Sequence, residues 1–272
     1  MKAAAFDYVR PTDVGGAIAL LQATPGSRPI AGGQSLVPML NLRLARPTRL
    51  VDVGRIGMLR AIEDHGAHVR IGAAVSHAEL EDRAIAGCAL LRTVAGGIAY
   101  RAVRTRGTIG GSVAHADPAA DWPLALAALG ATMIVQGKAG SRRVPADGFM
   151  LAAFQTRLAE DELIVAIDVP KLSPGARCGY YKFCRKTGEF PEASAAAVFD
   201  PASRAARLYL GALSGPPQSL PALAAAIARQ GAVAVTEGAI ADAVGELGEA
   251  DAVESRMRCA AVARALKQVF TR

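Results

Sequence analysis

Two short segments of the sequence combine adjacent glycines with small hydroxyl residues. The first glycine turn comprises Ala31, Gly32, Gly33, Gln34, Ser35 and Leu36, and the second comprises Thr108, Ile109, Gly110, Gly111 and Ser112. Adjacent glycines allow backbone N–H groups to converge on an anion, and hydroxyl groups beside them donate further hydrogen bonds to phosphate oxygens. The pattern predicts two turns that hold a phosphorylated ligand, although the residues alone equally permit two plain tight turns.

Neither glycine turn follows an established nucleotide-binding pattern. The Rossmann pattern requires G-x-G-x-x-G, and the P-loop requires G-x-x-x-x-G-K followed by serine or threonine. Both turns here contain a simple Gly-Gly pair instead. A nucleotide bound by them must therefore be held by a different architecture.

Polar side chains follow the second glycine turn. A carboxylate near a nucleotide accepts hydrogen bonds from sugar hydroxyls, and Asp121 is the better candidate for this role. Asp117 precedes Pro118, so we expect it to cap a helix rather than bind a ligand. A single histidine such as His115 is more often packed or solvent-facing than catalytic. No acid–base constellation is recognisable, and no catalytic residue is predicted.

The cysteines and histidines do not form a recognisable metal site. Four cysteines lack the C-x-x-C spacing of zinc and iron–sulfur sites, and four histidines lack the H-E-x-x-H pattern. We therefore expect free thiols and no metal held by this chain.

The composition limits the class of protein. Of 272 residues, 51% are hydrophobic, which excludes disorder as the dominant state. The longest apolar stretch is about half the ~20 residues that a membrane-spanning helix needs, so no span is expected. The N-terminus shows no secretory signal, so we expect a cytoplasmic location. The net charge of +7 is distributed over scattered arginines, with only 5% aromatic residues, which argues against nucleic-acid binding.

The densest basic group, Arg101, Arg104 and Arg106, lies just before the second glycine turn. Arginines are rarely buried without partners. We expect either a solvated basic face or contacts across a subunit interface, where arginine is favoured over lysine.

Three lobes are expected to position these residues. Residues 1–57 have β–α–β character, with strands at 6–11, 28–31 and 50–53, a helix capped by Thr12 and a helix or turn at 36–44. Residues 58–175 begin a second lobe, in which Ser76 and Glu79 form a capping box. Its other elements are helices at 89–100 and up to Leu129, and strands at 69–73, 132–136, 142–144 and 163–169.

Residues 170–175 are the best linker candidate, because they combine proline, serine and glycine. Beyond them, strands are expected at 179–185, 194–199 and 206–213, and helices at 220–229 and 253–270. Strands followed by segregated helices indicate an α+β C-terminal domain over residues 176–272.

The two glycine turns, with the segment His115–Asp121, resemble the FAD-binding medium subunit of the molybdenum hydroxylases. This family includes xanthine dehydrogenase and aerobic carbon monoxide dehydrogenase. The similarity extends over almost the whole chain. It is also carried by Phe6-Asp7-Tyr8, Leu50-Val51-Asp52, Ile71-Gly72-Ala73 and the run Lys182-Phe183-Cys184-Arg185-Lys186-Thr187-Gly188-Glu189-Phe190.

The resemblance implies an α+β fold. Residues 1–57 and 58–175 would form the two lobes of an FAD-binding fold of the vanillyl-alcohol-oxidase (PCMH) type. Residues 176–272 would form a C-terminal α+β domain of the CO dehydrogenase flavoprotein type. The resemblance also implies roles at the cofactor: both glycine turns at the FAD pyrophosphate, Asp121 at the sugar hydroxyls, Leu163 near the adenine or flavin, and Phe190 near the isoalloxazine. The eukaryotic xanthine pattern has a lysine where this chain has Glu192.

The function implied by the resemblance is electron transfer. The FAD would take electrons from [2Fe–2S] centres on a small subunit, after hydroxylation at a molybdopterin–molybdenum centre on a large subunit, and would pass them to an external acceptor. A dimer of heterotrimers is expected. The alternatives are a stand-alone FAD-dependent oxidoreductase of the same fold and a non-catalytic flavoprotein. We further expect Gly110→Val to lose FAD while keeping the fold, because a branched side chain would block the pyrophosphate.

Overall fold

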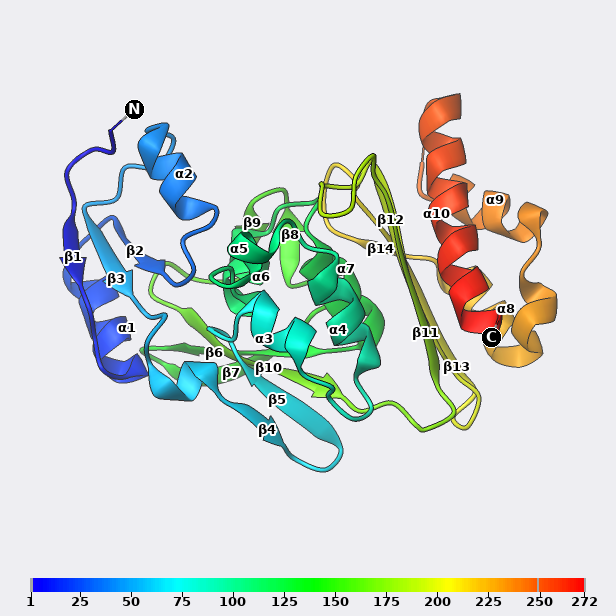
Figure 1. The fold of residues 1–272 in the computed structure, drawn as a ribbon, viewed down its shortest axis with the longest axis horizontal. Helices are drawn as coiled ribbons and strands as arrows, with labels where there is room; N and C mark the ends of the chain where they lie inside the picture. Colours follow the sequence, from blue (N-terminus) through cyan, green and yellow to red (C-terminus); the bar gives the residue numbers. More distant parts are fainter. Residues whose placement is uncertain (1, 249, 272) are drawn as a thin grey trace.

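The computed structural model describes residues 2–248 and 250–271 and arranges three main sheets along the molecule (Figure 1). The N-terminal lobe lies at one end, a central sheet with its helices lies in the middle, and the C-terminal sheet and helices lie at the other end. This mixture of segregated helices and sheets is the expected α+β class.

The N-terminal lobe is built on a parallel three-stranded sheet in the order β1-β3-β2. Its strands and helices are β1 (Asp7–Val9), α1 (Val14–Ala23), β2 (Ser27–Ile30), α2 (Leu36–Asn41) and β3 (Arg49–Asp52). The expected N-cap at Thr12 is wrong. Asp13 caps α1 instead, because its carboxylate accepts a hydrogen bond from the Gly16 N–H at 2.8 Å.

The central lobe contains a five-stranded antiparallel sheet in the order β4-β5-β10-β6-β7. Its strands are β4 (Ile62–Asp64), β5 (His68–Gly72), β6 (Thr132–Gly137), β7 (Gly140–Pro145) and β10 (Leu163–Pro170). The 3₁₀ turn η1 (Gly57–Arg60) precedes this sheet, and the short hairpin β8 (Met150–Ala152) and β9 (Gln155–Thr156) lies between β7 and β10. Pro170 is the last residue of β10, at its end, where a missing N–H is tolerated.

Five helices cover one face of the central sheet (Figure 1). They are α3 (His77–Asp82), α4 (Ala89–Gly96), α5 (Arg101–Arg104), α6 (Ile109–His115) and α7 (Asp121–Leu129). The capping box predicted at Ser76 and Glu79 is confirmed. The expected helix at 89–100 ends earlier, at Gly96, and the chain turns through Ala99 with a positive φ of 43° before α5 begins.

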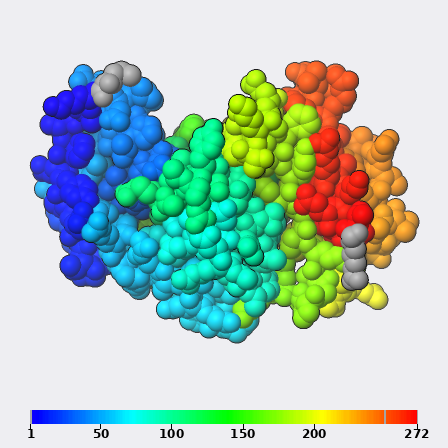
Figure 2. Space-filling model, in the orientation of Figure 1, coloured from blue at the N-terminus to red at the C-terminus, as the bar shows by residue number. Residues whose placement is uncertain are grey.

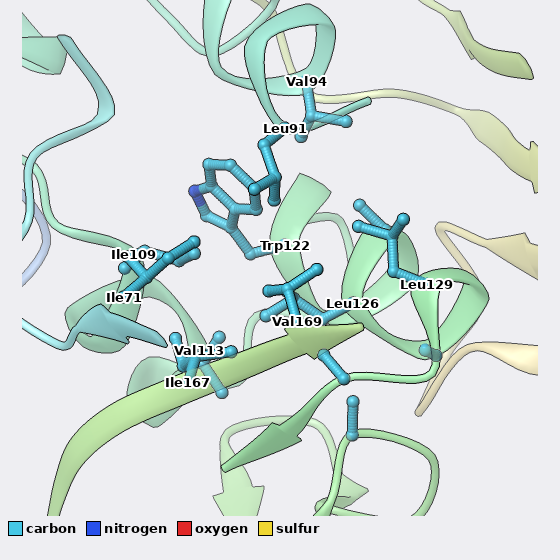
Figure 3. Packing of buried hydrophobic residues seen from close by; sticks show 14 of the residues in the cluster. Ile71, Leu91, Val94, Ile109, Val113, Trp122, Leu126, Leu129, Ile167 and Val169 are labelled. Carbon is cyan, nitrogen blue, oxygen red and sulfur yellow. The ribbon is translucent and has the colours of Figure 1, made fainter. Parts of the chain in front are cut away.

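The central core is centred on Trp122, the only tryptophan in the sequence. Figure 3 shows its ring among Leu91 and Val94 of α4 and Ile109 of α6, with Val169 of β10 nearby. Every residue of α7 is buried, so this helix is covered on all sides rather than being amphipathic. The position of α7 is thus fixed by packing on both the central sheet and the C-terminal domain.

The C-terminal domain is an antiparallel four-stranded sheet backed by helices. The sheet contains β11 (Arg177–Phe183), β12 (Ala193–Asp200), β13 (Ala205–Gly211) and β14 (Gln218–Ser219), in that order. The helical elements are α8 (Pro221–Gln230), η2 (Gly231–Ala234), α9 (Glu237–Gly245) and α10 (Ala252–Phe270). One face of the sheet packs on α8 and α10, and α9 packs against these two helices. Tyr180, Ala196 and Tyr209 instead join the central core.

The three main sheets use residues 7–52, 62–170 and 177–219. The predicted boundary after residue 57 falls within η1, and the one after residue 175 falls between β10 and β11. The division into domains at these positions stays a prediction. Within residues 2–248 and 250–271, no helix combines the length and apolar character needed to cross a membrane.

Candidate functional site

A large cleft runs between the N-terminal lobe and the central lobe and extends to the C-terminal domain. Its volume is about 1370 Å³, and its wall includes residues of both glycine turns. The space-filling view shows the outline hollowed between the blue N-terminal lobe and the green central region (Figure 2). The cleft is therefore the place where the fold brings together segments that lie more than seventy residues apart.

The first glycine turn joins β2 to α2 and has unpaired donors. Gly33 has a φ of +73°, a conformation that suits glycine. The N–H groups of residues 32–36 donate no hydrogen bond to the part of the chain that the structure describes. The Ser35 side chain also makes no capping bond to α2. Unpaired N–H groups in a row beside a hydroxyl are suited to an anionic group such as phosphate.

The N–H groups of the second glycine turn donate hydrogen bonds within the chain. The N–H groups of Ile109 and Gly110 donate to the carbonyls of Val75 and Ala73, and that of Gly111 donates to the Thr108 hydroxyl oxygen at 3.1 Å. The expectation that this turn offers converging backbone donors is therefore wrong. The turn still contributes Thr108, Gly110, the exposed Gly111 and the half-buried Ser112 to the cleft wall.

Ile109 does not lie as expected, and Gly110 lines the cleft but is also tightly packed. The Ile109 side chain is fully buried in the central core and does not line the cleft. At Gly110, an added Cβ would lie 2.4 Å from the Ala73 Cβ and 2.7 Å from the Ala73 carbonyl oxygen. The expectation that Gly110→Val keeps the fold is therefore wrong, because the missing side chain serves packing of α6 against the end of β5.

The first glycine turn touches the segment that leads into the second. A Cβ at Gly32 would lie 2.0 Å from the Arg106 carbonyl oxygen and 2.9 Å from the Gly107 Cα. Only glycine permits this approach of two backbones. The N-terminal lobe is thus seated against the segment that leads into the second turn, which fixes the width of the cleft at this point.

Asp121 lies at the start of α7 and is buried beside two residues of β11. Its carboxylate accepts a hydrogen bond from the Tyr180 hydroxyl at 2.6 Å and forms an ion pair with Lys182 at 3.1 Å. Burial raises the pKa of the Asp121 carboxyl, and the charge of Lys182 and the Tyr180 hydroxyl oppose that rise. Burial and the neighbouring Asp121 carboxylate also raise the pKa of Tyr180.

Lys182 is a cleft residue that the sequence reasoning did not select. Its ammonium group donates to the Gly97 carbonyl at 3.1 Å as well as to Asp121, and its side chain is 9% exposed. An ammonium has three donors, so one remains for a ligand. Its position at the start of the run 182–190, which carried the family resemblance, could have marked it as a site residue. Nothing in the local sequence, however, pairs it with Asp121.

Leu163 and Phe190 both line the cleft, although in different settings. Leu163 begins β10 and is 5% exposed in an apolar cluster with α1. Phe190 lies in the loop after β11, and its side chain is 66% exposed. An exposed aromatic ring at the wall of a cleft is available to pack against a planar ligand.

The remaining polar candidates have structural partners. The Asp117 carboxylate accepts from the Ala119 N–H at 2.9 Å, whereas the N-cap of α7 is Ala120, so the expectation that Asp117 caps this helix is wrong. The His115 ring packs against Phe154 with centroids 5.2 Å apart. Both residues line the cleft.

A second histidine, His77, lies at the cleft wall and was not selected from the sequence. The Trp122 indole N–H donates to its Nδ1 at 3.1 Å, so Nδ1 is unprotonated. Burial and the nearby positive charge of Arg104 lower the pKa of His77 to about 4. His77 is therefore a neutral imidazole at neutral pH, with its other nitrogen carrying the proton.

Two of the three arginines before the second turn have partners within the chain. Arg101 pairs with Glu81 and Asp82, and Arg104 pairs with Glu81 at 2.8 Å. Arg104 also donates to the carbonyls of Ile98 and Ala99, each at 2.8 Å. These two arginines are accordingly not a free basic face.

The groups at the cleft wall are suited to binding an anionic ligand. Among residues 2–248 and 250–271, no group of three or more histidine, cysteine or acidic side chains could hold a metal ion. The four cysteines are free, as expected. Unpaired N–H groups, free hydroxyls and one lysine suit a diphosphate, and the volume accommodates a dinucleotide, so these residues fit the expected FAD.

Comparison with known proteins agrees with this geometry. A family model described as "FAD binding domain in molybdopterin dehydrogenase" matches residues 4–172. The chain is 43% identical to the carbon monoxide dehydrogenase medium chain of Hydrogenophaga pseudoflava over 71% of this chain and 68% of that one. It is 37% identical to the nicotine 6-hydroxylase medium subunit of Paenarthrobacter nicotinovorans over 81% of this chain and 79% of that one.

Solved structures show the same likeness over the full length. A chain of carbon monoxide dehydrogenase from Hydrogenophaga pseudoflava superposes with a TM-score of 0.92 at 36% identity and 99% coverage of both chains. A chain of quinoline 2-oxidoreductase from Pseudomonas putida 86 gives a TM-score of 0.88 at 31% identity, covering 99% of this chain and 98% of that one. The likeness therefore includes the C-terminal domain, which lies outside the residues matched by the family model.

Proposed function

The chain belongs to the family of FAD-binding domains in molybdopterin dehydrogenases, and from this premise we propose how it works. It is the FAD subunit of a molybdenum-dependent oxidoreductase. The chemistry that FAD supplies when bound is electron transfer, here from [2Fe–2S] centres of a partner subunit to an external acceptor. The chain's own residues bind the cofactor, orient it and leave its reactive end accessible.

The observation that carries this proposal is the row of unpaired N–H groups in the first glycine turn. Residues 32–36 direct no N–H group to another part of the described chain, and they line the cleft. We propose that these donors, with the Ser35 hydroxyl, hold the FAD pyrophosphate. Charge-assisted hydrogen bonds of this kind contribute about 1.5–3 kcal/mol each, so a few of them suffice for tight binding.

The second glycine turn has a different role in this proposal. The hydrogen bonds of its N–H groups stabilise the start of α6. It therefore contacts the cofactor through the Ser112 side chain, and the absence of a side chain at Gly111 leaves room for the cofactor to come close. Thr108 keeps the turn in place through its bond to the Gly111 N–H. Ile109 serves only to anchor the turn in the core.

We assign the remaining cleft residues as follows. Lys182 donates a hydrogen bond to the cofactor, and Asp121 holds Lys182 in position rather than binding the sugar alone, because both carboxylate oxygens already have partners. Leu163 packs against an apolar part of the cofactor, and Phe190 packs at its exposed end. No residue is required to move a proton.

The partners follow from what the relatives are called. Two relatives are named as a medium chain and a medium subunit, so this chain is a medium subunit of a multi-subunit enzyme. We propose a large subunit with molybdopterin, a small subunit with the [2Fe–2S] centres, and assembly into a dimer of heterotrimers.

Purification of the chain alone and together with its co-expressed neighbours tests the proposal. We expect the isolated chain to carry FAD, not FMN, and to show no substrate turnover. Reduction of its flavin by a substrate should require the large and small subunits. Release of FMN alone would contradict the cofactor assignment. Turnover by the isolated chain would instead support a stand-alone oxidoreductase, and bound FAD that no neighbouring subunit can reduce would support a non-catalytic flavoprotein.

A further inference from the structure

The turn Gly97–Ala99 joins the central lobe to the C-terminal domain at the edge of the cleft. It follows the end of α4, where backbone carbonyls lack partners within the helix. Ile98 and Ala99 line the cleft together with Gly188 and Phe190. The Ala99 N–H donates to the Gly188 carbonyl at 3.0 Å, which links the backbones of the two parts directly.

The contact at Gly188 is too close for a side chain. Gly188 has a φ of +97°, and a Cβ there would lie 2.6 Å from the Ala99 carbonyl oxygen. Ala99 itself has a positive φ of 43°, which non-glycine residues rarely adopt. Such a conformation persists only where the surroundings hold it in place.

Arg104 holds the backbone of Ala99 in this conformation. One of its terminal nitrogens donates to the Ile98 and Ala99 carbonyls, each at 2.8 Å, and its other two nitrogens form a bidentate pair with Glu81 at 2.8 and 3.1 Å. Its side chain is only 12% exposed. A planar guanidinium presents donors in fixed directions, so a single side chain can bind a carboxylate and two carbonyls at once.

We propose that Arg104 is a positioning residue for the flavin end of the cleft. It fixes the turn Gly97–Ala99 against Glu81, and this turn fixes Gly188 and thereby the loop that carries Phe190. For the flavin, the inference rests on the function proposed above. Loss of Arg104 loosens the Phe190 loop and exposes the flavin ring to solvent, while the pyrophosphate contacts at the first glycine turn remain.

Arg101 provides a matched control. It lies one turn earlier on the same short helix and also pairs with Glu81, together with Asp82, but its side chain is 49% exposed and none of its hydrogen bonds reaches the turn Gly97–Ala99. Arg101→Gln and Arg104→Gln therefore remove the same charge from the same carboxylate. Only Arg104→Gln removes the bonds to the two carbonyls.

Hydrogen exchange on the full-length chain without flavin tests the positioning directly. We expect Arg104→Gln to accelerate exchange of the Ala99 amide about tenfold, the effect of losing one charge-assisted hydrogen bond, and to deprotect residues 184–190. Arg101→Gln should leave both segments unchanged. Equal exchange in the two variants would overturn the inference.

Iodide quenching of flavin fluorescence in the FAD-loaded chain tests the consequence at the cofactor. We expect stronger quenching in Arg104→Gln than in Arg101→Gln at equal FAD content. Gly188→Ala, which places a Cβ 2.6 Å from the Ala99 carbonyl oxygen and so displaces the same loop, should also increase quenching. It keeps the test valid if Arg104→Gln folds poorly. Unchanged quenching in both variants would overturn the inference. Absence of FAD from the wild-type chain would overturn the proposed function instead and would leave the exchange experiment interpretable.

Discussion

Gly110 and Gly111 are neighbours in the second glycine turn, yet the missing side chain serves a different purpose at each. At Gly110, a Cβ would meet Ala73 at 2.4 Å, whereas at Gly111 it would meet only the Thr108 hydroxyl oxygen, at 2.8 Å. We expect Gly110→Ala to lower the free energy of unfolding of the flavin-free chain by about 1–3 kcal/mol. Gly111→Ala should mainly weaken FAD binding, because its Cβ lies at the cleft wall.

Urea unfolding of the flavin-free chain and titration with FAD separate the two effects. Gly215→Ala, at a position where a Cβ would meet nothing within 4 Å, serves as the control. A stable Gly110→Ala chain with impaired FAD binding would show that the missing side chain at Gly110, which also lines the cleft, serves the cofactor rather than the packing of α6.

Burial of His77 should make the free energy of unfolding depend on pH. The pKa of His77 falls from the usual 6.5 to about 4 in the folded chain, chiefly because of burial. Between these pH values the unfolded chain binds more protons than the folded chain. The free energy of unfolding should therefore fall as the pH is lowered from 6.5 to 4, by up to about 3 kcal/mol from this residue.

Unfolding of the flavin-free chain, followed by the fluorescence of Trp122, measures this slope. His77→Gln keeps an acceptor for the Trp122 indole N–H but cannot be protonated, so it should flatten the slope. His65→Gln controls for the loss of a histidine, because the His65 side chain is 40% exposed in the native chain. A slope that is equally steep in His77→Gln and wild type would contradict the assignment.

At the scale of the element, two helices of the chain begin with a threonine N-cap, and they differ in their position relative to the cleft. Thr108 caps α6 through the Gly111 N–H, and Thr236 caps α9 through the Ala239 N–H, both at 3.1 Å. Of these two helices, α6 contributes residues to the cleft wall and α9 does not. We expect Thr108→Ala and Thr236→Ala to cost similar stability, about 1 kcal/mol each, since each removes one capping bond.

The two variants should differ in FAD affinity. Loss of the Thr108 cap loosens the second glycine turn, whereas loss of the Thr236 cap acts on the far side of the C-terminal sheet. Thermal unfolding of the flavin-free chains and FAD titration measure both effects. If the two variants bound FAD equally well, the second turn would have no part in holding the cofactor.

At the scale of the whole molecule, the central core crosses the boundary predicted after residue 175. Tyr180, Ala196 and Tyr209 belong to the same buried cluster as Trp122 and Leu124 of α7. A fragment of residues 1–175 would expose the apolar face of α7 to water. We expect this fragment to aggregate or to bind a hydrophobic dye such as ANS, and to lose FAD, since Lys182 is also removed.

The complementary fragment is the control for this prediction. Residues 176–272 contain a second apolar cluster of their own, built from β12, β13 and the C-terminal helices. We expect circular dichroism to show retained helix and strand in this fragment. A monomeric 1–175 fragment with wild-type FAD affinity would show that the two FAD-binding lobes suffice on their own.

Local sequence was sufficient for most elements and for the family. Hydrophobic periodicity and the Ser76–Glu79 capping box predicted helices and strands within a few residues, because these signals depend on neighbours in the chain. The two glycine turns carried the resemblance to FAD-binding subunits, because paired glycines beside hydroxyls allow a phosphate to approach the backbone. Where two competing caps were adjacent, as at Thr12 and Asp13, the local pattern was not decisive.

Only the tertiary structure decided how the site residues divide their tasks. The sequence shows two similar Gly-Gly pairs, but the N–H groups of the second turn donate to the carbonyls of Ala73 and Val75 after β5 and to the Thr108 hydroxyl, whereas those of the first turn are unpaired within the described residues. The pairing of Asp121 with Lys182 and of Arg104 with the turn Gly97–Ala99 also joins residues distant in sequence. A linear pattern records which groups are present, whereas their availability to a ligand depends on which partners the fold brings within hydrogen-bond distance.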